Sequence, residues 1–415
     1  MRLGDISNPD AARYGKPLDG VRVLALEQMQ ALPYATQLLA RMGADVVKVE
    51  STKGGDLGRG SQPSIPDPEG RPVGATYLRN NLDKRSICVD LKAPEGRQLI
   101  LDLAPKFDIV AENFKGGALA RMGLGYDDIA AVHPGVIYLS VSGFGNTTET
   151  PYDGWPAYAA VAEAMSGIYD YKLEPGRPPM VSPVGALGDI GTALFGTIGL
   201  LAALRHRDRT GEGQYIDVAM FDAMVSMTDL VTNFWSLGLR PEPGQGLAMI
   251  LDGFKAANGW FIIQVGREHE FERLANLIGR PDWLTDERLA TRALWREHMD
   301  DILRPGVNEW AASMTNIEAC QALAAAGVAA GPCLTAQQVI DDPHVAARDM
   351  LIEIPRLDGG DPVLTPGNPI KMSKMSEGPD VRMPWLGEHT DAVLAAELGL
   401  DDEALGRLRA NGVIA

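Results

Sequence analysis

The sequence predicts an α/β fold, in which a large domain with a parallel β-sheet covered by helices is interrupted by a smaller α+β domain. Three observations support this prediction. Strand and helix patterns alternate through residues 1–145, the composition changes after PEPGQG (241–246), and a strand and helix pattern resumes around 327–344. Repeated βα units favour a parallel sheet, and an inserted small domain produces this order of elements.

The elements of the first part follow from apolar runs, which indicate buried strands, and from Pro and Gly, which begin and end helices. They are strands at 21–26, 44–50, 86–91, 108–113 and 135–141, helices beginning at Pro33 and Pro94, and two short helices between 116 and 132. In a parallel sheet ligands gather at the carboxyl ends of the strands. Gln30, Asn113 and Ser142 are expected at this edge.

The later elements are assigned in the same way. They are a long loop at 51–80, a helix at 155–169, a loop at 174–188, a strand at 214–220 and an apolar helix that ends near 237. The inserted part is expected to have a strand at 259–265 and helices through 268–325, with Trp283, Trp295 and Trp310 in its core. A short strand at 351–355 and two terminal helices complete the chain. The predicted domains are 1–228, 229–329 with its connecting segments, and 330–415.

Composition excludes several classes of function. The 415 residues include 55 acidic and 38 basic side chains, a net charge of −17, which disfavours nucleic acid and anionic membranes as partners. Cys88, Cys320 and Cys333 lack the spacing of a disulfide framework or zinc site, and the histidines are never three or four residues apart, so no metal is expected. The N-terminus lacks an export signal, and apolar runs such as 193–204 are too short to span a bilayer. A cytoplasmic protein is predicted.

Common nucleotide-binding and hydrolase motifs are absent from the sequence. No G-x-G-x-x-G follows a predicted strand, and GFGNTT (143–148) fails at its last position. There is no G-x-x-x-x-G-K-[ST] loop and no G-x-S-x-G nucleophile elbow. A nicotinamide dehydrogenase is therefore disfavoured.

Asp189 stands at the start of a long apolar helix. Residues at helical spacing are expected to share one buried face of this helix: Leu194, Ile198, Leu201 and Leu204. One interpretation is that Asp189 only caps the helix as its N-cap residue. The other is that Gly185, Gly188 and Gly191 let another molecule approach, and that the helix dipole keeps the carboxylate anionic. An accessible anionic carboxylate can act as a nucleophile.

Positive charge is concentrated at RNNLDKRS, in Arg79, Lys84 and Arg85. Such a cluster is usually a solvated turn. In an acidic protein it is also a candidate phosphate-binding patch.

Several blocks of the sequence resemble the class III CoA-transferase family, also called the CaiB/BaiF family. In the family's order they lie at 18–50, 81–100, 108–129, 186–204, 209–223, 341–351 and 386–394. The resemblance implies a Rossmann-like large domain built from both ends of the chain, a small domain, and two subunits interlocked as a homodimer. Its substrates are an acyl-CoA and a carboxylic acid, and no cofactor is implied beyond the coenzyme A thioester.

The resemblance also implies roles for single residues. Asp189 falls on the aspartate of the family's G-D motif, which attacks an acyl-CoA thioester to give a mixed anhydride, and Gln30 would contact the thioester or acyl oxygen. Asn113, Phe114 and Arg121 would hold the pantetheine and phosphates of coenzyme A. Lys84 and Arg85 would border its nucleotide. Apart from the resemblance, the tetrahedral oxyanions of such a reaction need donors, and the flexible Gly backbone of the 244–246 turn is a candidate to supply N–H groups.

The sequence departs from its relatives at three positions. Leu32 replaces a common Gly and is expected to narrow the acyl space. Ser51 replaces an arginine that meets the nucleotide in some relatives. Ser142 replaces a lysine of the formyl-CoA transferase branch, from which we infer that the acid differs from oxalate.

Four interpretations of the function are compared: two modes of CoA transfer, a racemase and a binding protein. The segment from Trp155 to Gly238 looks most like the branch that moves CoA between the two carboxyls of one dicarboxylic acid, typified by mesaconyl-CoA C1–C4 transferase, with Arg267 or Arg71 as partner of the free carboxyl. Transfer between molecules, from succinyl-CoA, is the alternative. A racemase of 2-methylacyl-CoA ranks lower because Tyr158 stands at the place of its histidine, and a phenol, with an ordinary pKa of about 10, is a poor base at neutral pH. A binding protein on an inactive scaffold is disfavoured by the retained Asp189 and Gln30.

Overall fold

Six parallel strands form the sheet of the larger unit in the computed structural model, which describes residues 1–170, 176–181, 185–240 and 247–415. Their order is β5-β2-β1-β6-β7-β8, and every neighbouring pair is parallel. The strands are β1 (Arg22–Leu26), β2 (Asp45–Glu50), β5 (Lys84–Cys88), β6 (Ile109–Glu112), β7 (Ile137–Ser142) and β8 (Gln214–Ala219). The predicted α/β class and parallel sheet are confirmed. The strand order reverses between β1 and β6, which is where ligands bind in open sheets of this kind.

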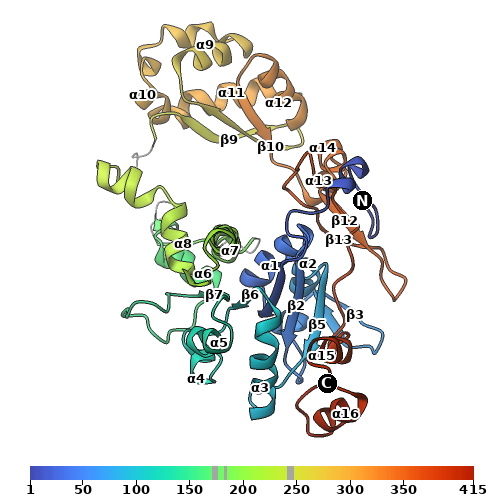
Figure 1. Cartoon of the computed structure of the whole chain (residues 1–415). Helices are drawn as coiled ribbons and strands as arrows, with labels where there is room; N and C mark the ends of the chain where they lie inside the picture. Colours follow the sequence, from blue (N-terminus) through green and yellow to red (C-terminus); the bar gives the residue numbers. More distant parts are fainter. Residues whose placement is uncertain (171–175, 182–184, 241–246) are drawn as a thin grey trace. The chain divides into compact units, whose positions relative to one another are not determined.

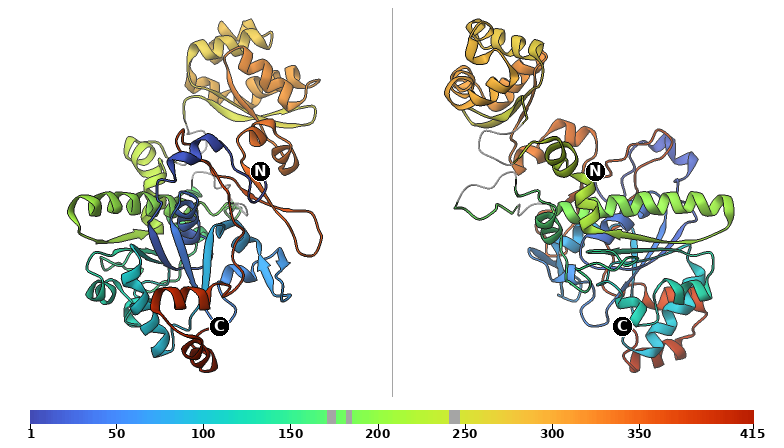
Figure 2. Two further views of the ribbon diagram at one scale, coloured as in Figure 1. Left: turned by 45° about the vertical axis from the view of Figure 1, so that its right-hand side comes forward. Right: turned by 90° about the vertical axis from the view of Figure 1, so that its left-hand side faces the viewer.

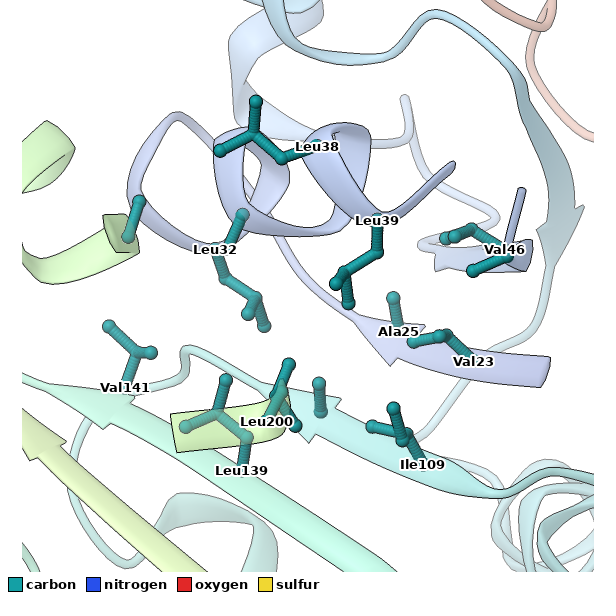
Figure 3. Close-up of a cluster of buried hydrophobic side chains, with 14 of the residues drawn as sticks. Val23, Ala25, Leu32, Leu38, Leu39, Val46, Ile109, Leu139, Val141 and Leu200 are labelled. Carbon is teal, nitrogen blue, oxygen red and sulfur yellow. The ribbon is translucent and has the colours of Figure 1, made fainter. Parts of the chain in front are cut away.

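Helices cover both faces of this sheet (Figure 1). One core lies between the sheet and α1 (Ala31–Arg41), α6 (Ala159–Met165), α7 (Leu187–Thr210) and α8 (Met220–Met227). Figure 3 shows part of it, with Leu32 and Leu39 of α1 pointing toward Ala25 of β1 and Leu139 of β7. The second core joins the other face to α3 (Pro94–Leu103), α4 (Ala118–Arg121), α5 (Tyr126–Val132), α15 (Thr390–Leu398) and α16 (Asp402–Ala410).

α7 runs along one side of the large sheet (Figure 2). The face of this helix that packs on the sheet differs from the prediction. Leu194, Ile198 and Leu201 are exposed, and of the four predicted core positions only Leu204 is buried. The face turned to the sheet carries small residues: a Cβ at Gly196 would lie 3.4 Å from Leu139, and one at Gly199 would lie 3.2 Å from Ile216. Small residues let the helix approach the strands closely. Leu200 and Leu204 fill the core beside them, whereas the other three predicted core residues lie on the opposite, exposed face.

α7 is also the one helix of the described residues that is long and apolar enough to cross a membrane. Half of its apolar window is buried within the protein. Core helices of globular domains commonly have this combination.

Of the described residues, the smaller unit comprises Asp170, 229–240 and 247–342. Its antiparallel sheet has the order β11-β10-β9, with β9 (Ile250–Ala256), β10 (Gly259–Val265) and β11 (Ala329–Pro332). The sheet packs on α9 (Glu268–Leu277), α10 (Arg292–Glu297), α11 (Arg304–Ala311) and α12 (Asn316–Ala325). Trp283 and Trp295 are buried in this core, and Trp310 packs against it.

The second unit continues past the predicted boundary at 329 because β11 pairs with β10. Of the described residues, the larger unit comprises 1–169, 176–181, 185–228 and 343–415. Two features of it lie in the stretch expected as a loop: the hairpin of β3 (Ser64–Pro66) and β4 (Pro72–Gly74), and α2 (Ala75–Asn80). The apolar helix expected to reach 237 ends as α8 at Met227 and is followed by a π-helical segment (Leu230–Phe234) and a 3-10 segment (Trp235–Leu237). The remaining elements are α13 (Ala336–Ile340), α14 (Pro343–Ala347), β12 (Leu351–Ile354) and β13 (Val363–Pro366).

Candidate active site

A cavity of about 220 Å³ lies at the carboxyl ends of β1, β6 and β7, within the larger unit. Its lining includes Asp189, Asn113 and Phe114, so the structure brings together three of the predicted site residues. Ser142, from the end of β7, and Tyr158, from the start of α6, line the same cavity. The reversal of strand order between β1 and β6 thus coincides with the residues that the sequence singled out.

A second cavity, of about 480 Å³, adjoins the first. The two share five lining residues: Lys115, Gly116, Ser142, Gly143 and Trp155. The larger cavity also contains Arg121, the last residue of α4. Neither Lys115 nor Arg121 forms an ion pair within the described part of the chain, so both cations are available to an anionic ligand.

Asp189 does not cap its helix. The N-cap of α7 is Ala186, and Asp189 is the third residue of the helix. Among the described residues no group donates a hydrogen bond to its carboxylate. The prediction that Asp189 is the N-cap is therefore wrong, because the helix begins three residues earlier than expected.

Because no N-cap side chain accepts a backbone N–H of the first turn of α7, another residue has to do so, and this residue is Glu163 of α6. Its Oε1 accepts the backbone N–H of Gly188 at 3.1 Å, and its Oε2 accepts the hydroxyl of Tyr169 at 2.7 Å. The side chain of Glu163 is buried, with 6% exposed. A buried carboxylate from a neighbouring helix thus satisfies the first turn of α7, which leaves the Asp189 oxygens unused.

Two of the three glycines around Asp189 serve packing and not the approach of a ligand. A Cβ at Gly188 would lie 3.0 Å from the Cα and carbonyl oxygen of Ala159, and one at Gly191 would lie 2.2 Å from the Cε of Met227. Gly185 alone faces open space, with φ of 74°. The expectation that all three glycines open the site is corrected accordingly.

The pKa of Asp189 is raised from 3.8 to about 6, first by burial and then by the nearby charge of Glu163. Above pH 6 the carboxylate is therefore ionised although nothing in the described protein donates to it. Burial without a hydrogen-bond donor makes the ionised group costly to the fold, and a carboxylate with a pKa raised in this way is a candidate for a functional residue.

Gln30 is the N-cap of α1 and follows a turn that lines the cavity through Gln28 and Met29. Gln30 itself is not among the lining residues, although Ala31 is. The side-chain amide of Asn113 holds this turn: Oδ1 accepts the N–H of Gln28 at 2.9 Å, and Nδ2 donates to its carbonyl at 2.8 Å. The side chain of Asn113 is thus occupied within the protein.

Lys84 and Arg85 are absent from both cavities. The Nζ of Lys84 is fully buried and lies 2.7 Å from Oε1 of Glu27, while Arg85 forms an ion pair with Asp45 at the amino end of β2, away from the ligand-binding edge. The prediction that these two residues border a nucleotide is not supported, because a sealed ammonium paired with a carboxylate has no path to a ligand. Arg79 stacks over the ring of Tyr34.

The other expectations have mixed outcomes. Leu32 is fully buried against the sheet, so it does not narrow the cavity. Arg71 pairs with Asp67 and Glu69 in the β3–β4 hairpin, and Arg267 is the N-cap of α9 in the smaller unit. The predicted oxyanion donors at 244–246 lie outside the described residues. Within the described residues no group of three or more His, Cys, Asp or Glu could hold a metal ion.

Glu163, Lys115 and Trp155 were not predicted as site residues. A lone carboxylate in the apolar helix AVAEAM is a signal that could have drawn attention to Glu163. Lys115 follows the N-F pair that was selected. Trp155 carries no local signal, since an exposed aromatic residue in a loop has many explanations.

Comparison with known proteins agrees with this geometry. The sequence model described as CoA-transferase family III matches residues 18–390. Succinyl-CoA:mesaconate CoA-transferase of Haloarcula hispanica is 36% identical over 400 residues, covering 94% of this chain and 97% of that protein. The succinyl-CoA–L-malate CoA-transferase beta subunit of Chloroflexus aurantiacus is 33% identical, covering 96% and 98%. A crystal structure of a CaiB/BaiF family protein from Brucella suis superposes with a TM-score of 0.79 at 35% identity, covering 92% and 99%.

Replacing Asp189 by Ala should stabilise the protein at neutral pH. A carboxyl whose pKa is higher in the folded state contributes stability at low pH that is lost as the pH rises from 3.8 through about 6. Removing it should raise the melting temperature at pH 7.5 by about 2–4 °C, the shift that 1 kcal/mol produces in a large domain. The gain should shrink at pH 4.5. Asp208→Ala, at an exposed position of the same helix, is the control; a lower melting temperature for Asp189→Ala would restore the capping role.

Proposed function

Because the chain belongs to CoA-transferase family III, we propose that it transfers coenzyme A between carboxyl groups through an anhydride formed on Asp189. The observation that carries this proposal is the Asp189 carboxylate, which lines a cavity at the ligand-binding edge of the sheet and accepts no hydrogen bond from the described residues. A carboxylate that served only the fold would be hydrogen-bonded.

The proposed reaction is nucleophilic catalysis. An oxygen of Asp189 attacks the thioester carbonyl, the C–S bond breaks, and a mixed anhydride and the CoA thiolate result. Attack of the thiolate on the aspartyl carbonyl releases the donor acid and leaves CoA on Asp189. The acceptor carboxylate then attacks that thioester, and the thiolate takes the acceptor acyl group from the new anhydride. No water enters, and Asp189 is regenerated.

The adjoining cavity is suited to coenzyme A. Lys115 and Arg121 are cations without ion-pair partners in the described chain, on a protein whose net charge is −17. Phosphates bind to such groups through charge-assisted hydrogen bonds. Because Lys115 also lines the Asp189 cavity, a CoA ester bound in the larger cavity would direct its thioester toward the nucleophile.

We propose a dicarboxylic acid as the acyl group. The names of the similar proteins pair succinyl-CoA with mesaconate and with L-malate, which favours transfer between two molecules. Transfer within one mono-thioester, from one carboxyl to the other, is the second candidate and is favoured by the likeness of the segment from Trp155 to Gly238 to that branch.

We further propose that two copies of the chain form a homodimer through the apolar face of α7. Leu194, Phe195, Ile198 and Leu201 form a continuous row at helical spacing and are 37–61% exposed in the single chain. An apolar row of this kind on a long helix is typical of a protein–protein interface. A second copy, which carries the same row, is the occupant that the family resemblance implies.

Asp189→Ala should abolish transfer. With succinyl-CoA and a dicarboxylic acid, kcat should fall by about 10³-fold or more, the loss typical of a removed nucleophile, while binding of the CoA ester changes by about threefold at most. Hydroxylamine added during turnover should modify Asp189 in the wild type, detected by peptide mass spectrometry. Asp208→Ala should retain activity. Wild-type activity in Asp189→Ala would refute the mechanism.

The same assay separates the alternatives. Isotope-labelled free acid should enter the CoA-ester pool if transfer occurs between molecules. If the CoA-ester pool stays unlabelled while CoA moves from one carboxyl of the acid to the other, transfer occurs within one molecule. Exchange of the α-hydrogen with solvent would favour the racemase, in which Tyr158 faces the same cavity as Asp189.

Glu163→Gln should shift the pH dependence of the reaction. In the wild type kcat/KM should fall below pH 6, because the nucleophile must be ionised and its pKa is about 6. Gln keeps the acceptor for the Gly188 N–H but removes the charge that raises the Asp189 pKa. The pH below which kcat/KM falls should therefore be lower in the variant. If kcat/KM falls at the same pH in the variant and in the wild type, Glu163 does not act on Asp189 electrostatically.

Ile198→Asp should convert the dimer into monomers, because two carboxylates would be buried at the interface. Light scattering coupled to size-exclusion chromatography measures this directly. Leu357→Asp is a matched control, since Leu357 is 59% exposed and Ile198 is 61% exposed. A dimer that survives Ile198→Asp would exclude this face.

A further inference from the structure

The turn between β1 and α1, residues 27–30, forms one wall of the Asp189 cavity. Met29 in this turn has φ of 64°, a left-handed conformation that residues with a Cβ rarely adopt. Such a conformation persists only where the surrounding structure holds it. The groups that hold Met29 therefore determine the shape of the wall.

The backbone of the turn is held on both sides. The N–H of Met29 donates to Oδ1 of Asp56 at 2.8 Å, and the carbonyl of Glu27 accepts from Nζ of Lys48 at 3.2 Å. Between them, Asn113 bonds both backbone groups of Gln28. The three side chains come from different parts of the chain, so the turn is fixed by tertiary contacts.

Asp56 is itself fixed from several directions. Its Oδ2 lies 2.7 Å from Nζ of Lys48, its Oδ1 also accepts the N–H of Gly58 at 2.7 Å, and its own N–H donates to Glu50 at 2.9 Å. The side chains of Asp56 and Lys48 are both fully buried. A carboxylate bound in this way cannot change rotamer without removing the nearer of the two carboxylate partners of a buried ammonium, which would keep only Glu27 at 3.4 Å.

The network continues to the first turn of α1. Glu27 accepts Lys84 Nζ at 2.7 Å and the hydroxyl of Thr36 at 2.7 Å. Lys84 also donates to the carbonyl of Pro33 at 2.9 Å. Burial alone would raise the pKa of Glu27, but Lys84 and Lys48 outweigh it and hold this pKa below its ordinary value. The segments before and after the Met29 turn are thus joined to one buried set of charges.

We propose that Asp56, held by Lys48, is a positioning residue for the transfer reaction. By fixing Met29 in its left-handed conformation, Asp56 sets the wall against which the thioester meets Asp189. The inference rests on the proposed function, since it assigns Asp56 a role in the reaction at Asp189. Neither Asp56 nor Lys48 lines the cavity. Asp56 is connected to the cavity wall through the Met29 turn and through its chain neighbour Leu57, and the inference assigns the effect to the Met29 turn.

Asp56→Ala should lower kcat by about 10- to 100-fold, the loss that small misplacements of reacting groups produce. The KM for the CoA ester should change by about threefold at most, because the cavity with Lys115 and Arg121 is formed by other segments. Asp67→Ala is the matched control: Asp67 is also buried and accepts two backbone N–H groups, from Glu69 and Arg71, in a hairpin of the same unit. Its kcat should equal that of the wild type.

Met29→Gly tests the route of the effect. Gly adopts positive φ without strain, so residue 29 would no longer need Asp56 to hold it. The fold-loss in kcat caused by Asp56→Ala should therefore be at least threefold smaller in the Met29→Gly protein than in the wild type. Equal losses in the two backgrounds would overturn the inference, as would an unchanged kcat in Asp56→Ala. If Asp56→Ala does not fold, the same comparison is made with Asp56→Asn. Asn keeps the acceptor for the Met29 N–H but removes the charge that faces Lys48. An inactive wild type would refute the proposed function instead.

Discussion

The first turn of α7 needs a hydrogen-bond acceptor, and the group that supplies it decides what Asp189 can do. In most helices an Asp near the start would bond its own backbone N–H groups. Here Glu163 reaches from α6 to the N–H of Gly188, which is possible because Gly188 has no Cβ to separate the two helices. Asp189 is thereby left with oxygens that bond no donor in the described protein.

The contact of Glu163 with the first turn of α7 also destabilises the ionised form of Asp189. Glu163 satisfies the helix but places a second carboxylate near Asp189, and with burial it raises the Asp189 pKa to about 6. The folded protein therefore keeps an ionised, undersolvated carboxylate at neutral pH. Destabilised groups of this kind concentrate at reactive sites, since the interactions that would stabilise them would also remove their reactivity.

The sequence predicted the large sheet well because buried parallel strands are continuous apolar runs. β1, β2, β6, β7 and β8 each lie within a residue or two of their predicted ends. It failed on α7 because both faces of that helix are apolar, and periodicity does not say which face meets the sheet. Asn113 and Ser142 were found through topology, since the residues that follow parallel strands lie at one edge.

Lys84 shows why the site could be predicted only in part. A cluster of basic letters indicates charge but not burial, and the partner that buries Lys84, Glu27, lies 57 positions away. Glu163 likewise lies 25 positions from the N–H that it accepts. Local patterns do not contain such pairs.

The buried and the accessible cations of the larger unit have separate roles. Lys48 and Lys84 are sealed among carboxylates below the turn at Met29, where a ligand cannot reach them. Lys115 and Arg121 line open cavities and have no ion-pair partner in the described chain. In a protein with a net charge of −17, an anionic ligand is repelled from most of the surface, so unpaired cations that line a cavity favour its binding there. Under the proposed function the buried cations shape the wall of the reaction cavity, and the accessible cations select the ligand that enters it.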